Sequence, residues 1–148
     1  MKRALFTIPV GILLCLMMIS CSDKQASSQY VSIDENLTLQ SKKDRALANR
    51  FIEYWDARST HQFDKSYKYE LPYDRYLKDI KQYRAELAVT LENYHVKMDK
   101  IEYLDADKRV ALVYRTYTRE KVLLKIKSKW IFVNGTWYRK YDFSLFPN

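Results

Sequence analysis

The side chains best suited to chemistry in this 148-residue chain are two cysteines, two histidines and a set of acids. His61 and His95, with no cysteine beyond Cys15 and Cys21, do not make a His/Cys zinc site. The acids on segments of helical spacing are Asp56, Asp64, Glu70, Asp74 and Asp79. Acid–base catalysis needs such groups within hydrogen-bond reach, which spacing alone does not establish. We therefore predict no catalytic residue, metal or cofactor; enzymatic activity stays open, with a non-enzyme favoured.

Cys21 is the residue with the most informative surroundings. Lys2 and Arg3 give the chain a positive start, and an uncharged, mostly apolar run from Ala4 to Ile19 follows. This run is shorter than the roughly 20 residues that cross a bilayer as a helix. A positive start, a short apolar run and a small residue before a cut site are typical of a secretory signal peptide.

The end of the run resembles the lipobox of bacterial lipoproteins, with the sequence Met18-Ile19-Ser20-Cys21. The resemblance implies that residues 1–20 are removed and that Cys21 is lipidated as the new N-terminus. Ser22, where Asp would favour the inner membrane, implies an outer-membrane anchor facing the periplasm. An ordinary signal peptide or an uncleaved anchor, with Cys21 incidental, remains the alternative.

The rest of the chain divides into a tether and one domain. Residues 21–40 are polar and predict a flexible tether behind the lipidated cysteine. Residues 41–148 hold the periodic patterns of a single domain, and 47% apolar residues exclude a disordered chain. The net charge of +8 is typical of nucleic-acid binders, but export makes nucleic acid an unexpected partner.

Two kinds of hydrophobic period follow one another in the domain. Ser41 and Asp44 predict the start of a helix that ends near Ser59. A short helix over 63–70, broken by Pro72, and a third over 73–87 follow. Alternating runs then predict strands over 94–104, 109–118, 121–132 and 137–145. We predict an α+β fold: N-terminal helices packed in the concave face of a curved antiparallel sheet of four or more strands, cone-like.

Asn134-Gly135 fixes the register of the last hairpin as a two-residue type I′ turn. The predicted core face carries Val122, Leu124, Ile126, Ser128, Trp130, Phe132, Trp137, Arg139, Tyr141 and Phe143. The opposite, solvated and basic face carries Lys125, Lys127, Lys129, Tyr138, Lys140 and Asp142. Arg139 is the only charged residue on the apolar face, which makes it the most unusual residue of the hairpin.

The layout resembles the nuclear-transport-factor-2-like domains, the conical α+β family that includes SnoaL-like and ketosteroid-isomerase-like proteins. The residues that carry this resemblance are Phe51-Ile52-Glu53-Tyr54-Trp55-Asp56-Ala57-Arg58, Phe63-Asp64-Lys65-Ser66-Tyr67, and Trp130 with Asn134-Gly135-Thr136-Trp137-Tyr138-Arg139. Such endings are common in bacterial lipoproteins of unknown function. The resemblance implies a pocket inside the cone, but the Asp or His acid–base pair of its catalytic members is not matched residue by residue in this sequence.

The candidate pocket residues are Trp55, Trp130, Trp137, Arg139 and Tyr141. In an aromatic cavity, Arg139 could hold a carboxylate or another anion by paired hydrogen bonds. The favoured alternative is that its stem packs on Trp130 while its head lies at the rim or pairs with a helix acid such as Asp56 or Asp64. A possible partner surface is formed by Tyr67, Tyr69, Tyr73, Tyr76 and Tyr83. Core packing is the favoured alternative for these tyrosines.

We therefore predict a lipid-anchored lipoprotein of the envelope whose domain binds an envelope protein or a small-molecule ligand without catalysis. The alternatives are an enzyme of the ketosteroid-isomerase or dehydratase kind and a structural accessory subunit of an envelope complex. The membrane is the partner expected from Cys21. The sequence leaves the ligand, the protein partner and the oligomeric state open.

Overall fold

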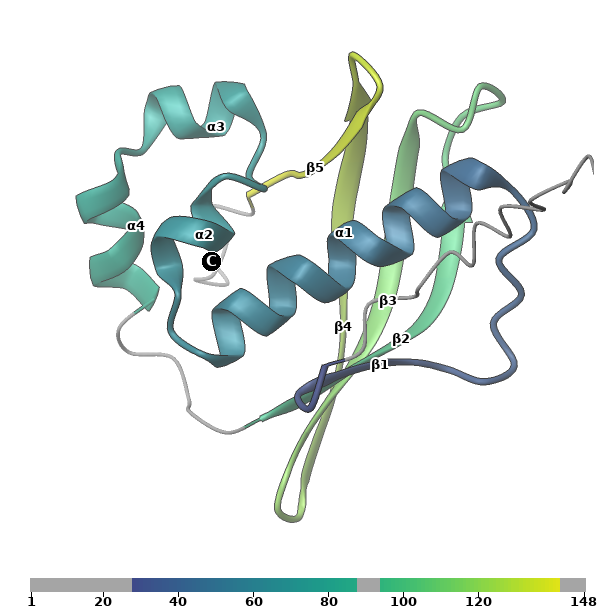
Figure 1. Ribbon diagram of the computed structural model, residues 1–148, viewed down its shortest axis with the longest axis horizontal. Coiled ribbons are helices and arrows are strands. Elements are labelled where there is room, and N and C mark those ends of the chain that lie inside the picture. The colour runs from purple at the N-terminus through teal and green to yellow at the C-terminus, as the bar shows by residue number, and fades with distance from the viewer. Residues whose placement is uncertain (1–27, 88–93, 142–148) are drawn as a thin grey trace, which may run out of the picture.

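The computed structural model describes residues 28–87 and 94–141. In these residues the elements run β1, then α1 to α4, then β2 to β5. The predictions for Cys21, the signal peptide, Asp142 and Phe143 lie outside the described residues. α1 crosses one face of the sheet, and the shorter helices gather at one end of α1 (Figure 1).

The first long helix begins and ends where the sequence predicts. α1 spans Lys42–Ser59 and starts with a capping box. The Asp44 amide donates to Ser41 Oγ at 3.0 Å, and the Ser41 amide donates to Asp44 Oδ2 at 2.8 Å. Two of the amide groups left without partners at the helix start are thereby satisfied.

The remaining helices are shorter than predicted: α2 Phe63–Tyr67, α3 Pro72–Leu77 and α4 Ile80–Leu87. Pro72 begins α3 at the first helical position, where its missing amide hydrogen has no cost. The single helix predicted over 73–87 is two helices. Asp79 Oδ1 accepts from the amides of Lys81 and Gln82 at 2.8 and 2.9 Å, which starts a new helix there.

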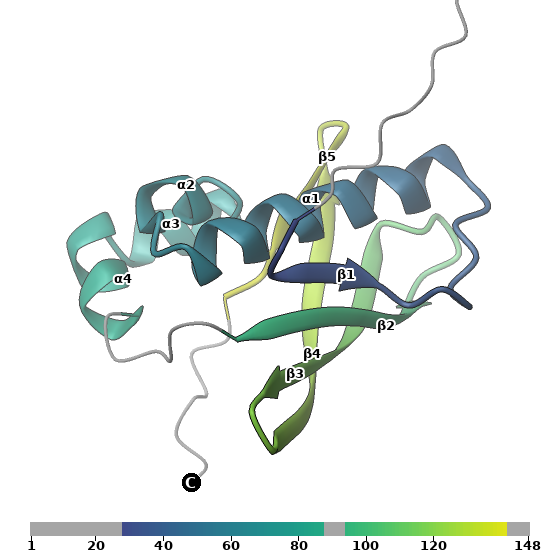
Figure 2. The same ribbon diagram turned by 60° about the horizontal axis from the view of Figure 1, so that its bottom comes forward.

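The sheet has five strands in the order β1-β2-β3-β4-β5, and it curls around α1 (Figure 2). β2 His95–Tyr103, β3 Val110–Arg119, β4 Val122–Val133 and β5 Thr136–Arg139 pair antiparallel in chain order. β1 Val31–Ile33 pairs parallel to β2, with Val31 beside Val96. The prediction of an antiparallel sheet is therefore wrong at this edge, because β1 is joined to β2 through all four helices rather than through a hairpin.

β1 lies within the segment that the sequence predicted to be a tether. Val31 is buried, and Leu37 and Leu39 pack against the same core. From Ser28 onwards the described part of this segment therefore belongs to the folded domain. The few apolar residues of this segment lie in one short strand and in the turn that leads into α1.

The core lies between α1 and the covered face of the sheet. Trp55, Trp130 and Trp137 are almost fully buried. The ring of Tyr54 meets those of Trp55 and Trp130 edge to face, with centroids 4.8 and 5.9 Å apart. Such edge-to-face pairs add to the burial of apolar area, so a core with few aliphatic side chains is held by aromatic ones.

The last hairpin has the predicted register over its described length. Val133 pairs with Thr136, Phe132 with Trp137 and Trp130 with Arg139. β5 ends at Arg139, so the predicted pair of Ser128 with Tyr141 is not part of the ladder.

The start of β4 corrects the predicted core face. Val122, Leu124 and Ile126 lie on that face but are 57%, 51% and 43% exposed. The β3–β4 hairpin extends past the region that α1 covers (Figure 1). Alternation therefore identified the face correctly, but this part of it has no helix above it.

The turn at Asn134-Gly135 offers a direct test of the hairpin. Gly135 has φ of +80°, and nothing lies within 4 Å of a Cβ built on it. We predict that Gly135→Ala lowers the free energy of unfolding by about 1–2 kcal/mol, entirely through the left-handed backbone. Gly135→Asn, which tolerates this conformation better, should lose less in the same denaturant titration. Equal stability of Gly135→Ala and the unaltered protein would contradict the assigned turn.

Candidate functional site

Arg139 is held inside the domain by an ion pair. Arg139 Nη1 lies 3.0 Å from Glu70 Oε1 and 3.2 Å from Glu70 Oε2, and both residues are buried. The alternative in which Arg139 pairs with an acid of the protein is thus correct in kind. The partner is Glu70, however, and neither Asp56 nor Asp64. Backbone bonds reinforce the pair, because the Arg139 amide donates to the Tyr69 carbonyl at 2.8 Å.

Tyrosine hydroxyls complete the surroundings of the Glu70 carboxylate. Tyr54 and Tyr83 donate to Glu70 Oε1 at 2.8 and 3.1 Å, and Arg58 Nη1 donates to the Tyr54 hydroxyl at 2.8 Å. Burial raises the pKa of Tyr54 well above its usual value and that of Tyr83 to about 12. Both phenols therefore stay protonated and act as donors at neutral pH. The network joins α1, α4 and β5.

The five candidate pocket residues form core rather than the lining of an open pocket. Trp55, Trp130, Trp137, Arg139 and Tyr141 are all at most 8% exposed. Trp130 Nε1 donates to Ser128 Oγ at 3.1 Å, and Trp137 Nε1 donates to the Lys43 carbonyl at 3.2 Å. The structure brings Trp55, Trp130 and Arg139 together around Tyr54. Tyr141 belongs with Tyr83 to the second core cluster, and the Arg139 guanidinium carbon lies 5.6 Å from the centre of its ring.

The tyrosines of the predicted partner surface separate into two groups. Tyr69 and Tyr83 are buried, and the half-buried Tyr67 donates to the carbonyls of Arg75 and Lys78 at 2.8 Å each. These three stabilise the packing of the short helices. Tyr73 and Tyr76 on α3 are 65% and 87% exposed and remain available on the surface.

A cluster of arginines around Trp55 was missed by the sequence analysis. The guanidinium carbons of Arg115, Arg58 and Arg139 lie 4.6, 5.4 and 5.9 Å from the centre of the Trp55 ring. Arg115 projects from the core face of β3, between Met98 of β2 and Ile126 of β4. The alternation of Ala111, Val113 and Arg115 along β3 is the signal that places Arg115 on this face.

The cluster holds more donors and more positive charge than the protein around it satisfies. Trp55 Nε1, Arg115 Nη1 and Arg58 Nε are buried and have no hydrogen-bond partner. Arg115 Nε reaches only the Tyr117 hydroxyl, at 3.4 Å, and burial lowers the pKa of Arg115. Among the described residues, the carboxylate beside this cluster is that of Glu70, which Arg139 already engages. Buried charges are ordinarily paired, so this imbalance is unusual.

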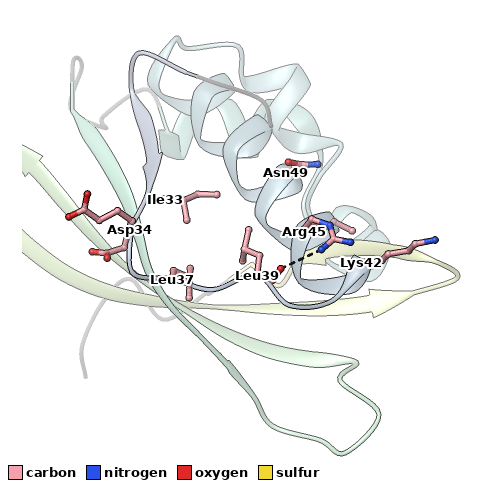
Figure 3. A pocket seen from close by; sticks show the side chains of 9 residues that line it. Ile33, Asp34, Leu37, Leu39, Lys42, Arg45 and Asn49 are labelled. Carbon is pink, nitrogen blue, oxygen red and sulfur yellow. Dashed lines mark hydrogen bonds between the residues drawn. The ribbon is translucent and has the colours of Figure 1, made fainter. Parts of the chain in front are cut away.

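Hollows also open on the surface, and two of them are larger than the others described here. One, of about 650 Å³, lies between residues 33–39 and the first half of α1. Figure 3 shows Ile33, Leu37 and Leu39 on one side of it and the polar Arg45 and Asn49 on the other. The other hollow, of about 830 Å³, lies on the outer face of the sheet among Lys97, Lys100, Lys125 and Lys127. Lys97 there is paired with Asp34 at 2.6 Å, so part of this charge is neutralised.

The exposed start of β4 is a further candidate. We call Val122, Leu123, Leu124 and Ile126 the hairpin patch; each is between 43% and 59% exposed. β5 pairs with β4 only over Trp130–Val133, so from Val122 to Ser128 the outer edge of β4 has no neighbouring strand in the described part of the chain. Lys125, Lys127 and Lys129 alternate with the patch and are exposed. An open, apolar strand edge is a place where another strand can add.

Comparison with known proteins corrects the family resemblance. No protein-family model and no curated protein matches the chain. A solved structure that matches is the solution structure of a SEC-C motif containing protein from Rhodopseudomonas palustris. It has 17% identity, covers 66% of this chain and 74% of its own, and gives a TM-score of 0.43. The expected membership of the nuclear-transport-factor-2-like family is therefore wrong on this finding, and a match this weak assigns no function.

Within 28–87 and 94–141, no helix is long and apolar enough to span a membrane. Within the same residues, no group of three or more His, Cys, Asp or Glu side chains is placed to hold a metal ion.

Because Glu70 belongs to a buried ion pair, we expect its substitution to lower the stability of the domain. We predict that Glu70→Gln lowers the free energy of unfolding by about 3–5 kcal/mol, because it leaves the Arg139 charge buried without a counterion. Glu53→Gln is the matched control, since Glu53 is half-buried and accepts from the Tyr69 hydroxyl at 2.9 Å. Its effect in urea titration should be much smaller. Adding Arg139→Met to Glu70→Gln should recover part of the loss; a loss no larger than that of Glu53→Gln would contradict the role assigned to the pair.

Proposed function

We propose that the chain is a lipid-anchored protein of the bacterial envelope, attached through Cys21 and facing the periplasm from the outer membrane. Its domain is non-catalytic and binds a protein partner along the open edge of β4. The observation that carries the partner-binding role is the hairpin patch, four large apolar side chains exposed on one strand that extends beyond the helical cover. Val122, Leu124 and Ile126 share one face of this strand, and exposed apolar surface of this kind marks interaction sites.

The chemistry of the strand defines the kind of partner. Val122, Leu124 and Ile126 alternate with Leu123, Lys125 and Lys127 along the same edge. An added strand would place its apolar side chains beside the first set and acidic side chains beside the lysines. Backbone hydrogen bonds along the edge would supply affinity, while the alternation would fix the register. The proposed partner is therefore a protein segment that is extended and alternates apolar with acidic residues.

The anchor is supported by the sequence before the domain. An apolar run that stops at Ser20-Cys21 and turns polar at once has the form of a processed lipoprotein signal. The lipid would hold the domain at a membrane surface, where a weak partner site acts at high local concentration. A role as an accessory subunit of an envelope complex is one form of this same function.

The anchor is tested by mass and fractionation. We expect the mature chain to begin at Cys21, to carry a mass increase equal to diacylglycerol plus an acyl chain, and to sediment with membranes. Cys21→Ser should abolish both the added mass and the membrane association. An unmodified, freely soluble protein would contradict the anchor and leave the partner site to be tested alone.

The partner site is tested by site-specific photo-crosslinking in the cell that makes the protein. A photoreactive residue at Leu123 should give a protein adduct, whereas the same residue at Leu104, which is 50% exposed in the β2–β3 turn, should not. Leu124→Lys in the Leu123 background should reduce the adduct at least tenfold without changing the melting temperature.

The adduct also reports the chemistry of the partner. Mass spectrometry should place the crosslink in a segment that alternates apolar and acidic residues. Equal adducts at Leu123 and Leu104, no adduct at either, or a crosslink to residues 142–148 of the same chain would each contradict the proposal.

A further inference from the structure

We propose that Arg115 and Trp55 form the binding site for the carboxylate of a small ligand with an apolar body. The site lies on the core face of the sheet beside the C-terminal end of α1. It rests on buried charge and hydrogen bonding rather than on an open strand edge, and it shares only Leu124 and Ile126 with the hairpin patch.

The proposed site carries a surplus of buried positive charge. Arg58, Arg115 and Arg139 are each at most 8% exposed and gather around one indole ring. In the described part of the chain, Glu70 is the one carboxylate in contact with them, and it lies 3.0 Å from Arg139. Burying an unpaired cation costs several kcal/mol. A surplus of buried positive charge is therefore complementary to an anion.

The proposed site also contains buried hydrogen-bond donors that have no acceptor. Trp55 Nε1 and Arg115 Nη1 are both buried without an acceptor, and the Arg115 guanidinium carbon lies 4.6 Å from the Trp55 ring centre. Trp130 and Trp137, the other two tryptophans, both donate to acceptors of the protein. Trp55 is thus the exception among three buried indoles. A bound carboxylate would supply an acceptor oxygen to each of these two side chains.

Apolar side chains lie next to the charged groups of the proposed site. Arg115 pairs across the sheet with Ile126, and Tyr117 pairs with Leu124 on the same face. Ile126 and Leu124 are 43% and 51% exposed, so an apolar surface begins next to the buried guanidinium. A carboxylate head at Arg115 would place the rest of the ligand against these side chains. A cation beside an apolar surface suits a ligand with an anionic head and an apolar body. The proposed ligand class is therefore a carboxylate with an aliphatic or aromatic body.

The test follows the three indole N–H signals by NMR in the mature, lipid-anchored protein in nanodiscs. Hexanoate is the probe. We expect the Trp55 signal, assigned with Trp55→Phe, to shift on titration, while the Trp130 and Trp137 signals stay in place because their N–H groups are already bonded. Arg115→Met should abolish the shift. Hexyltrimethylammonium, which has the same body with the opposite charge, should leave all three signals unchanged.

Stability separates a binding role from a merely structural one. Arg115→Met replaces an unpaired buried charge by a side chain of similar volume, so its melting temperature should be unchanged or higher. Arg139→Met leaves the Glu70 carboxylate buried without its counterion, so this variant should melt at a lower temperature. Hexanoate should raise the melting temperature of the unaltered protein and not that of Arg115→Met.

Four results would overturn the inference. One is a Trp55 signal that hexanoate leaves unmoved. Another is an equal shift in Arg115→Met, which would place the ligand elsewhere. The third is a shift with hexyl phosphate but not with hexanoate, which would replace the carboxylate by a phosphate. A fall in the melting temperature of Arg115→Met as large as that of Arg139→Met would make Arg115 a structural residue.

Discussion

The Glu70 carboxylate is 1% exposed, so its charge has to be met by the protein itself. It accepts from the Arg139 guanidinium of β5, from the Tyr54 hydroxyl of α1 and from the Tyr83 hydroxyl of α4. These groups come from three elements that are far apart in the chain. Each of them loses a partner if the carboxylate moves, so the position of the short helices relative to the sheet depends on this one group.

The balance of charge differs on the other side of the Tyr54–Trp55 pair. The Tyr54 hydroxyl accepts from Arg58 and donates to Glu70, so it bridges the guanidinium and the carboxylate by hydrogen bonds. Arg115 lies beyond this chain of bonds and interacts with Trp55 and Tyr117 through their rings. A ring face attracts a cation but does not neutralise it. Among the described residues, the same core therefore contains one carboxylate surrounded by its donors and one guanidinium, that of Arg115, with no carboxylate in contact with it.

How far the sequence could predict this structure depends on the range of each interaction. The Ser41–Asp44 capping box and the Asn134-Gly135 turn are local, and both lie where they were predicted. The parallel pairing of Val31 with Val96 and the ion pair of Glu70 with Arg139 join residues more than 60 positions apart. No local pattern determines such contacts, and a three-residue strand carries too few side chains to show a period.

The exposed hairpin patch shows a second limit of prediction from the sequence, which concerns the relative lengths of a helix and the strand it covers. An alternating pattern gives the face of a strand, but burial also requires an element that covers this face. α1 has 18 residues and is about 27 Å long, whereas β4 has 12 residues and is about 40 Å long. A single helix of this length cannot cover the whole strand even when the two are aligned. A strand end that served only to reach its turn would be free to carry polar residues on both faces. The apolar side chains at positions 122, 124 and 126 instead continue the core face beyond its helix, and their burial requires something other than α1.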